Sequence, residues 1–288
     1  MFRGAYTAIV TPFTRKGEVD YDALGRLIDE QFEGGVDGLV PVGTTGESPT
    51  LDMPEHQKVI EFTIERVAKR GKVIAGTGAN STSEALELTA HAKEAGADGC
   101  LQVTPYYNKP SQAGLIQHFT AVADLGLPVV LYNIPGRTAR ELTLETVVEL
   151  AKHPSIVSIK EAAGDVDRVS RYVGACDIEV VSGDDGLTLP MMVVGAVGVI
   201  SVAANVAPKP VSDMVHAALD GRWDEARALH RRLHPLFTDL FIDTNPVPVK
   251  AALAMMGRME EVYRLPLCAM TEAQKETLRK TLKSLNLL

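Results

Sequence analysis

The chain has 288 residues, of which 45% are hydrophobic and 23% charged, so it can bury a large core and is not disordered as a whole. Its formal net charge is −8 at pH 7 and it has no basic cluster, which argues against nucleic acid and anionic membrane surfaces as partners. Because its three cysteines are widely spaced and its amino terminus resembles neither a signal nor a transit peptide, we expect a cytoplasmic protein with reduced thiols.

Short apolar segments rich in β-branched residues alternate with segments of helical periodicity, as in a parallel sheet covered by helices. We predict eight strands, at Tyr6–Val10, Gly38–Val42, Val73–Ala75, Gly99–Val103, Val129–Tyr132, Ile156–Lys160, Glu179–Ser182 and Gly198–Ser201. Each is followed by a predicted helix, at Tyr21–Glu33, Pro54–Lys69, Ser83–Ala95, Ser111–Ala123, Leu144–Ala151, Asp167–Val173, Leu187–Val194 and Pro208–Asp220. Eight such units in succession favour an α/β fold of the closed (β/α)8 TIM barrel type over an open doubly wound sheet.

The chain after Gly221 has no further strand pattern. Amphipathic helices are predicted there at Trp223–Leu236, Val247–Met256 and Glu272–Leu285. No low-complexity linker separates this part from the rest. We therefore expect a barrel of residues 1–221 and a C-terminal helical region of residues 222–288 packed on it.

Residues 186–208 carry no charge, and that length is sufficient to span a bilayer. Pro190, Gly195 and Gly198 interrupt the apolar run. A buried helix followed by a fully buried parallel strand has the same composition, and we prefer this interpretation to a membrane span.

The active site of such a barrel lies at the carboxyl ends of the strands, so polar residues directly after each strand are informative. The second strand leads into a loop, residues 43–48, that contains Thr44, Thr45 and Ser48 between glycines. Glycines let a backbone approach a ligand, and the N–H and hydroxyl groups of such a loop can hold a carboxylate. A tight turn between strand and helix is the structural alternative.

Tyrosines and an arginine follow the fourth and fifth strands. Tyr106 and Tyr107 lie in a proline-bounded loop, and Tyr132 ends the fifth strand, with Arg137 five residues further on. Phenols at the barrel mouth can transfer protons, and a guanidinium can bind a carboxylate through two hydrogen bonds. Taken alone, Arg137 fits a solvated surface charge better than a binding residue.

Lys160 ends the sixth strand, inside a run of residues otherwise suited to burial. A lysine among apolar neighbours loses proton affinity and presents a free amine, the form that attacks a carbonyl carbon. The alternative is a strand-end lysine whose flexible chain reaches water. Tyr132 on the adjacent strand, with Thr44, favours the catalytic interpretation, since both hydroxyls can transfer protons beside that amine.

Three other patterns do not predict sites. Asp184 and Asp185 have no histidine cluster beside them and also fit capping of a helix, so we predict no metal site. His230 and His234 lack the His-Glu-x-x-His pattern and fit a solvated helix face. Residues 76–80 lack the third glycine of a dinucleotide fingerprint.

Two stretches together resemble the hallmarks of the pyruvate-dependent class I aldolase family that contains the dihydrodipicolinate synthases and N-acetylneuraminate lyases. They are residues 43–47, Gly-Thr-Thr-Gly-Glu, and residues 132–135, Tyr-Asn-Ile-Pro, followed at the expected interval by residues 159–162, Ile-Lys-Glu-Ala. The resemblance covers essentially the whole chain. Within the family, the double threonine, the tyrosine pair at 106–107 and Gly-Arg-Thr at 136–138 resemble the synthase branch.

This resemblance implies a lyase without a metal or organic cofactor, in which Lys160 forms an imine with pyruvate. It implies a proton relay of Tyr132, Thr44 and Tyr107. Tyr107 would be contributed by the second subunit, across a dimer interface. Thr45, Gly183 and Ile200 would line the pyruvate pocket with Thr44, and Arg137 would bind the carboxylate of L-aspartate 4-semialdehyde. The product implied is 4-hydroxy-tetrahydrodipicolinate, on the route to lysine and diaminopimelate, and the assembly implied is a homotetramer, a dimer of dimers.

Family members inhibited by lysine bind it at the dimer interface, and this sequence matches at five positions, Ser48, His56, Asn80, Glu84 and Tyr106. The resemblance therefore implies inhibition by lysine. Pro49 and Met53 depart from the loop expected of regulated bacterial members, which implies a weaker effect.

Two other functions stay open at this point. One is a lyase of the same mechanism acting on N-acetylneuraminate or a 2-keto-3-deoxy sugar acid, which Arg137 would distinguish by facing a polyol in place of a short dicarboxylic partner. The other is a non-catalytic barrel that binds small acids, which would form no covalent adduct on Lys160.

Overall fold

The computed structural model describes all 288 residues, and its centre is a closed barrel of eight parallel strands. The strands are β1 (Gly4–Ala8), β2 (Gly38–Val40), β3 (Lys72–Gly76), β4 (Gly99–Val103), β5 (Val129–Asn133), β6 (Ile156–Glu161), β7 (Glu179–Ser182) and β8 (Gly198–Ser201). Each strand pairs with the next in sequence, and β8 pairs with β1 to close the ring. The predicted (β/α)8 barrel is thereby confirmed.

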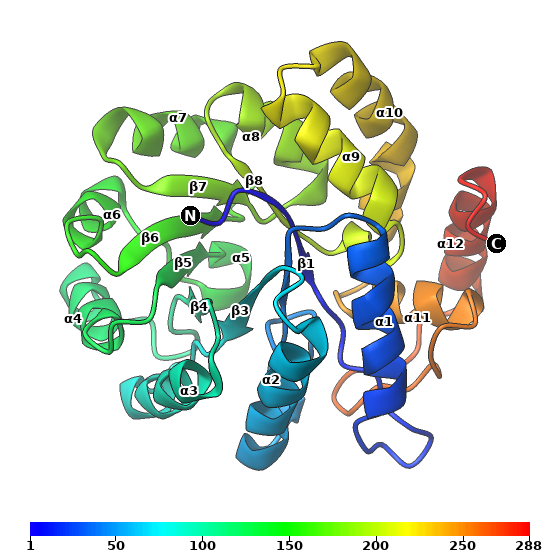
Figure 1. Ribbon diagram of the computed structural model, residues 1–288, viewed down its shortest axis with the longest axis horizontal. Coiled ribbons are helices and arrows are strands. Elements are labelled where there is room, and N and C mark those ends of the chain that lie inside the picture. Colours follow the sequence, from blue (N-terminus) through cyan, green and yellow to red (C-terminus); the bar gives the residue numbers. More distant parts are fainter.

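Helices surround the strands on the outside, in chain order around the ring (Figure 1). They are α1 (Tyr21–Glu33), α2 (Met53–Val67), α3 (Thr82–Ala95), α4 (Gln112–Ala123), α6 (Leu144–Leu150), α7 (Val166–Ala175), α8 (Thr188–Val193) and α9 (Pro208–Leu219). Several begin with a side-chain cap: Asp20, Asp52, Ser111 and Thr143 each accept a hydrogen bond from a backbone N–H of the first turn. These caps explain why the helices begin where the sequence predicts.

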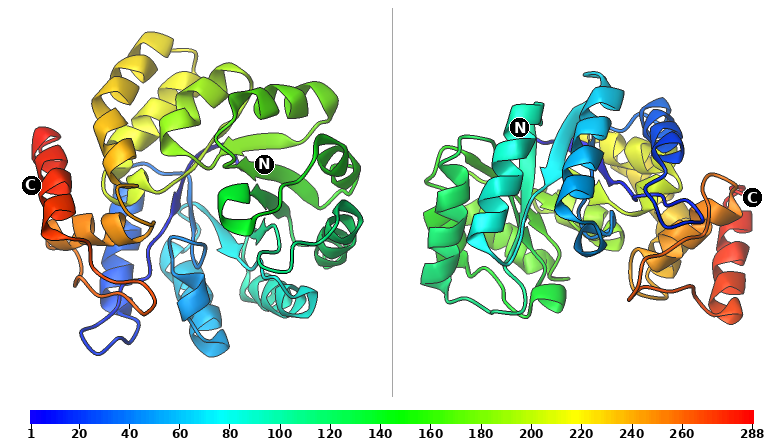
Figure 2. Two further views of the ribbon diagram at one scale, coloured as in Figure 1. Left: turned by 180° about the vertical axis from the view of Figure 1, so that it is seen from behind. Right: turned by 90° about the horizontal axis from the view of Figure 1, so that it is seen from below.

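The C-terminal region forms α10 (Trp223–Asp239), α11 (Val247–Met255) and α12 (Glu272–Ser284). Figures 1 and 2 show these helices beside the barrel near α1 and α9, with α12 at the outer edge. Their apolar residues join one core with those of the barrel helices, for example Leu236 and Leu253 with Leu24 and Val215. The fold thus has the predicted C-terminal helices, and their apolar side chains belong to the core of the barrel helices.

The structure corrects several predicted boundaries. The first strand covers Gly4–Ala8, two residues earlier than predicted, because Gly4–Thr7 is the part that pairs with β8. The second helix ends at Val67, since Ala68 and Lys69 both adopt left-handed backbone conformations. Four short helices were not predicted: α5 (Pro135–Thr138), η1 (Ser48–Thr50), η2 (Asp185–Leu187) and η3 (Ala203–Asn205). Three of them begin within three residues of a strand end, whereas η1 follows β2 after the loop of residues 41–47.

The uncharged segment 186–208 folds as the end of η2, then α8, β8 and η3. Most of its apolar side chains are buried in the protein core. None of the helices combines the length and the apolar character needed to cross a bilayer. The composition of this segment is therefore explained by a buried helix and a buried parallel strand.

Candidate active site

Lys160 lies near the carboxyl end of β6 and is only 5% exposed to solvent. Its register partner on β5 is Tyr132, so both side chains project from the same face of the sheet. The Lys160 Nζ lies 4.3 Å from the centroid of the Tyr132 ring. This Nζ forms no ion pair or hydrogen bond within the chain. The low exposure of the residue excludes the alternative in which the Lys160 side chain reaches bulk water.

Burial lowers the pKa of Lys160 to about 8; the Asp185 carboxylate opposes the shift and the positive charge of Arg137 adds to it. A lysine with the ordinary pKa of 10.5 is almost wholly protonated at pH 7. The shift increases the fraction of free amine at that pH by roughly two orders of magnitude. The amine is thus suited to nucleophilic attack at neutral pH.

Tyr132 is buried beside Lys160, and burial raises the pKa of its phenol to about 12, against the opposing effects of Arg137 and a hydrogen bond with Thr44. The hydroxyl therefore remains protonated at neutral pH and can donate a proton. Thr44, in the loop after β2, is the neighbour through which that proton can pass. The predicted grouping of Lys160, Tyr132 and Thr44 exists in the fold.

The residues that follow Tyr132 and Lys160 fix these two strand ends. Asn133 and Glu161 are register partners that point outward, and Asn133 Nδ2 donates to both Glu161 carboxylate oxygens at 3.1 and 2.9 Å. Glu161 also accepts from the Ala163 N–H at 2.7 Å and from the Tyr172 hydroxyl at 3.2 Å. The alternation along each strand therefore places a reactive residue inward and its anchor outward.

Lys160 borders a cavity of about 50 Å³ at the barrel mouth. Its walls come from the tail and from every strand, or the loop after it, except β3: Ala8, Val40, Gly43, Thr44, Thr45, Leu101, Tyr132, Ile134, Arg137, Lys160, Gly183, Val202, Phe241 and Asn245. Gly183 is required there, because a Cβ at that position would lie 2.8 Å from Lys160 Cε and 2.7 Å from Ala162 Cβ. Ile200 is buried in the barrel interior but is not a wall residue, and Val202 takes that place.

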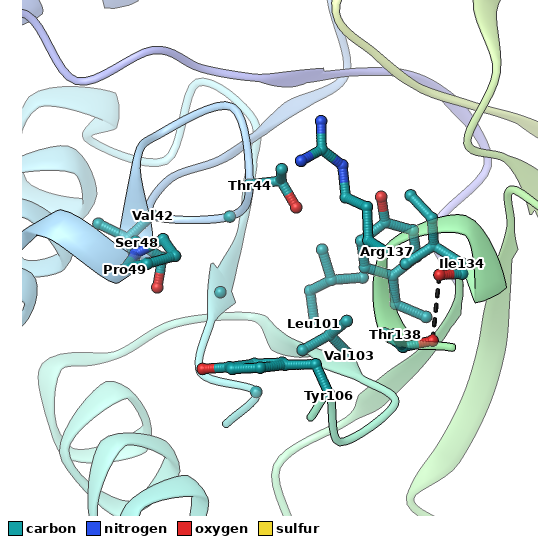
Figure 3. A pocket seen from close by; sticks show the side chains of 14 residues that line it. Val42, Thr44, Ser48, Pro49, Leu101, Val103, Tyr106, Ile134, Arg137 and Thr138 are labelled. Carbon is teal, nitrogen blue, oxygen red and sulfur yellow. Dashed lines mark hydrogen bonds between the residues drawn. The ribbon is translucent and has the colours of Figure 1, made fainter. Parts of the chain in front are cut away.

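A larger cavity of about 230 Å³ continues outward from this one and shares Thr44, Tyr132 and Arg137 with it. In Figure 3, Thr44 and Arg137 lie at one end of this cavity and the Tyr106 ring lies at the other. Arg137 belongs to the short helix α5 and donates from Nη2 to the Asn245 carbonyl at 2.9 Å. The positive charge of Arg137 thus lies where the outer cavity meets the Lys160 cavity, so the guanidinium can bind an anionic second substrate.

Tyr107 is not brought into this site by its own chain. Its side chain is 91% exposed, and its backbone is left-handed with φ 71°. Its neighbour Tyr106 turns inward and lines the outer cavity. The two tyrosines of the pair therefore face different surroundings.

A separate cavity of about 180 Å³ adjoins the outer one, and Ser48, Pro49, Gly78 and Tyr106 line both. Its other walls are Leu51, Met53, His56, Glu84 and Leu88. Four of the five residues predicted to hold lysine meet here; Asn80 does not line the cavity and binds Asn108 Nδ2 through its carbonyl at 2.8 Å. We call this the side cavity.

His56 in the side cavity donates from Nε2 to the Gly76 carbonyl at 2.8 Å, and burial lowers the pKa of its imidazole, partly offset by that hydrogen bond. The ring is therefore neutral near pH 7, and its Nδ1 is left without a proton. A neutral imidazole and the carboxylate of Glu84 together suit a ligand that carries an ammonium group.

Asp184 and Asp185 have structural roles. Asp184 caps η2 by accepting from the Gly186 N–H at 3.0 Å, as the capping interpretation predicts. Asp185 is buried and accepts from the Ser201 hydroxyl and from the N–H groups of Val202 and Ala203 at 3.0 Å. No group of three or more His, Cys, Asp or Glu is placed to hold a metal ion.

Asn245 and Phe241 are wall residues that sequence reasoning missed. Both come from the segment between α10 and α11, more than 80 residues beyond Lys160 in the chain. Asn245 Nδ2 donates to Thr45 Oγ1 at 3.0 Å. The only sequence signal was an asparagine followed by proline, which indicates a turn and no particular location in the fold.

The model of the dihydrodipicolinate synthetase family matches residues 1–285. The 4-hydroxy-tetrahydrodipicolinate synthase of Aquifex aeolicus is 52% identical to this chain over 291 residues, which cover 100% of this chain and 99% of the relative. The crystal structure of dihydrodipicolinate synthase from Aquifex aeolicus has a TM-score of 0.97 at 52% identity, with 99% of each chain covered. The Acinetobacter baumannii enzyme complexed with pyruvate has a TM-score of 0.98 at 46% identity, with 100% of both chains covered. The Cyanidioschyzon merolae enzyme with lysine bound has a TM-score of 0.96 at 42% identity, covering 100% of this chain and 99% of the other. This chain therefore belongs to the dihydrodipicolinate synthetase family.

Proposed function

We propose that the chain condenses pyruvate with L-aspartate 4-semialdehyde to 4-hydroxy-tetrahydrodipicolinate through an imine on Lys160. The observation that carries this proposal is the buried Lys160 amine, which has no ionic partner and shares a cavity with Tyr132 and Thr44. Relatives named for this reaction match the full length of the chain. A non-catalytic barrel that binds small acids would be better served by a fully charged lysine than by an amine whose pKa is lowered to about 8.

The first step joins the free Lys160 amine to the keto carbon of pyruvate and releases one water molecule. The imine withdraws electrons, so the methyl group loses a proton and the resulting enamine attacks the aldehyde carbon of the second substrate. The amino group of that substrate then attacks the imine carbon, closes the ring and frees Lys160. Because the imine itself is the electron sink, the reaction needs no metal or organic cofactor.

Tyr132 and Thr44 supply the proton transfers in this scheme. The phenol lies beside the amine, and its raised pKa keeps it able to donate to the oxygen that leaves as water. We assign Tyr107 as the third member, contributed by a second copy of the chain, because its side chain is exposed and lines neither catalytic cavity of its own chain. This assignment accompanies our proposal that the enzyme is a homotetramer built as a dimer of dimers in the cytoplasm.

Substrate binding divides between the inner and outer parts of the site. We assign the pyruvate carboxylate to the hydroxyls of Thr44 and Thr45, which face the Lys160 cavity with Gly183. We keep Ile200 as interior support for that pocket, since it packs inside the barrel without reaching the cavity wall. Arg137 lines both the inner and the outer cavity and is assigned to the carboxylate of the semialdehyde.

We expect Arg137→Met to raise the KM for L-aspartate 4-semialdehyde by roughly 10- to 100-fold, the range for loss of hydrogen bonds to a charged group. The KM for pyruvate should change far less. The measurement is steady-state product formation, with the product followed by mass spectrometry. Arg140→Met is the matched control, since Arg140 donates to the Lys109 carbonyl and does not line either cavity.

The same assay tests the proposed function as a whole. Wild-type protein should condense pyruvate with the semialdehyde and should not cleave N-acetylneuraminate or 2-keto-3-deoxy sugar acids at a comparable rate. Cleavage of a sugar acid without condensation would assign the chain to the lyases and refute the proposal.

We further propose that the side cavity binds lysine as a feedback inhibitor. Ser48, His56, Glu84 and Tyr106 line it, with Asn80 nearby, and the neutral His56 ring beside the Glu84 carboxylate suits an ammonium group. A relative from Cyanidioschyzon merolae has been solved with lysine bound. Pro49 and Met53 line the same cavity, so the two residues that depart from the regulated pattern lie where they would alter binding.

We expect millimolar lysine to lower the steady-state rate, and Glu84→Gln to raise the lysine concentration needed for half inhibition by roughly tenfold or more, because a charged partner of the ammonium is lost. The readout is the ratio of rates with and without lysine for each protein. Glu87→Gln, one turn along the same helix and outside the cavity, is the control. A rate that does not respond to lysine would disprove this regulation.

A further inference from the structure

Lys250 on α11 is a fully buried lysine that does not line the active-site cavities. Its Nζ donates to Glu47 Oε1, and the Glu47 side chain is also fully buried. The same Nζ lies 4.1 Å from the centroid of the Phe13 ring. A buried ion pair contributes little net stability compared with apolar residues of the same shape, so its presence calls for another explanation.

Glu47 is the last residue of the threonine loop, which we define as residues 43–47 between β2 and η1. Its backbone is left-handed with φ 55°, a conformation that a residue with a side chain keeps only where its surroundings hold it. Its carbonyl accepts from the Thr50 N–H at 2.9 Å, and its N–H donates to the Thr44 carbonyl at 3.1 Å. The position of Glu47 is therefore coupled directly to the backbone of Thr44.

The segment before α11 makes a second contact with the same loop. Asn245 Nδ2 donates to Thr45 Oγ1 at 3.0 Å, and the Asn245 carbonyl accepts from Arg137 Nη2 at 2.9 Å. Residues of one tail segment, 245–250, thus hold the threonine loop at two points, its middle residue Thr45 and its last residue Glu47. Neither contact joins the tail to Lys160 or to β6.

We propose that Lys250 is a positioning residue for the reaction: through Glu47 it holds Thr44 and Thr45 in place against the Lys160 cavity. The C-terminal region is then part of the catalytic apparatus and more than a support for the barrel. This inference rests on the proposed function, because it assigns Lys250 to the pyruvate half of that reaction.

The test is the double variant Glu47→Gln/Lys250→Met, which removes both charges and nearly preserves shape, so that no lone charge stays buried. We expect a folded protein in which kcat/KM for pyruvate falls roughly 100-fold, the effect of misplacing binding groups by about 1 Å. The KM for the semialdehyde should be unchanged, since Arg137 keeps its own contact with Asn245. Borohydride reduction should still trap pyruvate on Lys160, but more slowly.

The control is Glu261→Gln/Lys275→Met, which removes a partly buried ion pair of the same C-terminal region that does not touch the threonine loop. It should keep wild-type turnover. A Glu47/Lys250 variant no slower than this control, or one that loses affinity for both substrates equally, would overturn the inference.

Two further measurements keep the test decisive. If the double variant does not fold, the single variant Glu47→Gln replaces it, because its amide retains an oxygen that can accept from Lys250. We expect a smaller decrease in kcat/KM for pyruvate, again with an unchanged KM for the semialdehyde. Normal kinetics in this variant would overturn the inference. Wild-type protein that traps no pyruvate would instead refute the proposed function, so the two failures are distinguishable.

Discussion

Lys160→Ala is expected to lower turnover by at least about 1,000-fold, because the covalent route through the imine disappears. The folded structure should persist, since the amine has no hydrogen bond or ion pair whose partner would be left alone. Electrospray mass spectrometry after borohydride reduction should show one pyruvate-derived mass increase on the wild-type chain and none on the variant. In the wild type, the rate of trapping should rise as the pH is raised towards 8, where the amine loses its proton.

Lys152→Ala provides the control, because Lys152 is solvent-exposed and lies outside both cavities. It should keep both turnover and trapping. Near-normal turnover of Lys160→Ala would remove the basis of the proposed mechanism, whatever the trapping experiment showed.

Tyr132→Phe is expected to lower kcat by roughly 100- to 1,000-fold, the usual contribution of a positioned proton donor. The phenylalanine ring keeps the apolar wall beside Lys160, so pyruvate should still bind and the imine should still be trapped at a reduced rate. Stopped-flow measurement of imine formation, compared with steady-state turnover, separates the two effects.

Tyr6→Phe is the matched control for this substitution. Tyr6 is also a buried tyrosine inside the barrel, but it belongs to β1 and lines neither cavity. It should keep wild-type kinetics. If Tyr132→Phe were equally active, proton transfer would have to be assigned to another group.

The barrel and its central residues were predictable because they depend on local sequence. Strand and helix periodicities alternate eight times, and the carboxyl ends of parallel strands meet at one face of a barrel. That rule was sufficient to bring Lys160, Tyr132 and Thr44 together from three strands. The buried hydrogen bonds between Asn133 and Glu161 were harder to predict, because the sequence does not distinguish a solvated polar residue at a strand end from a buried one.

The contacts from the tail were not predictable in this way. Asn245 and Lys250 reach the threonine loop across about 200 residues of sequence, and amphipathic periodicity does not say which part of a barrel a helix covers. Lys250 in addition resembled any lysine of an exposed helix face. Tyr107 is a different case, because its assigned partner lies on another copy of the chain and a single chain leaves it in solvent.

The side cavity and the outer catalytic cavity have a wall in common, made by Ser48, Pro49, Gly78 and Tyr106. Any rearrangement of that wall changes the free energy of binding on both sides, and thermodynamic linkage makes the change reciprocal. Whatever factor lysine imposes on the equilibrium binding of substrate, substrate imposes on lysine. By our assignment the outer cavity receives the semialdehyde, so the level of that substrate would shift the lysine concentration at which the proposed inhibition stops lysine synthesis.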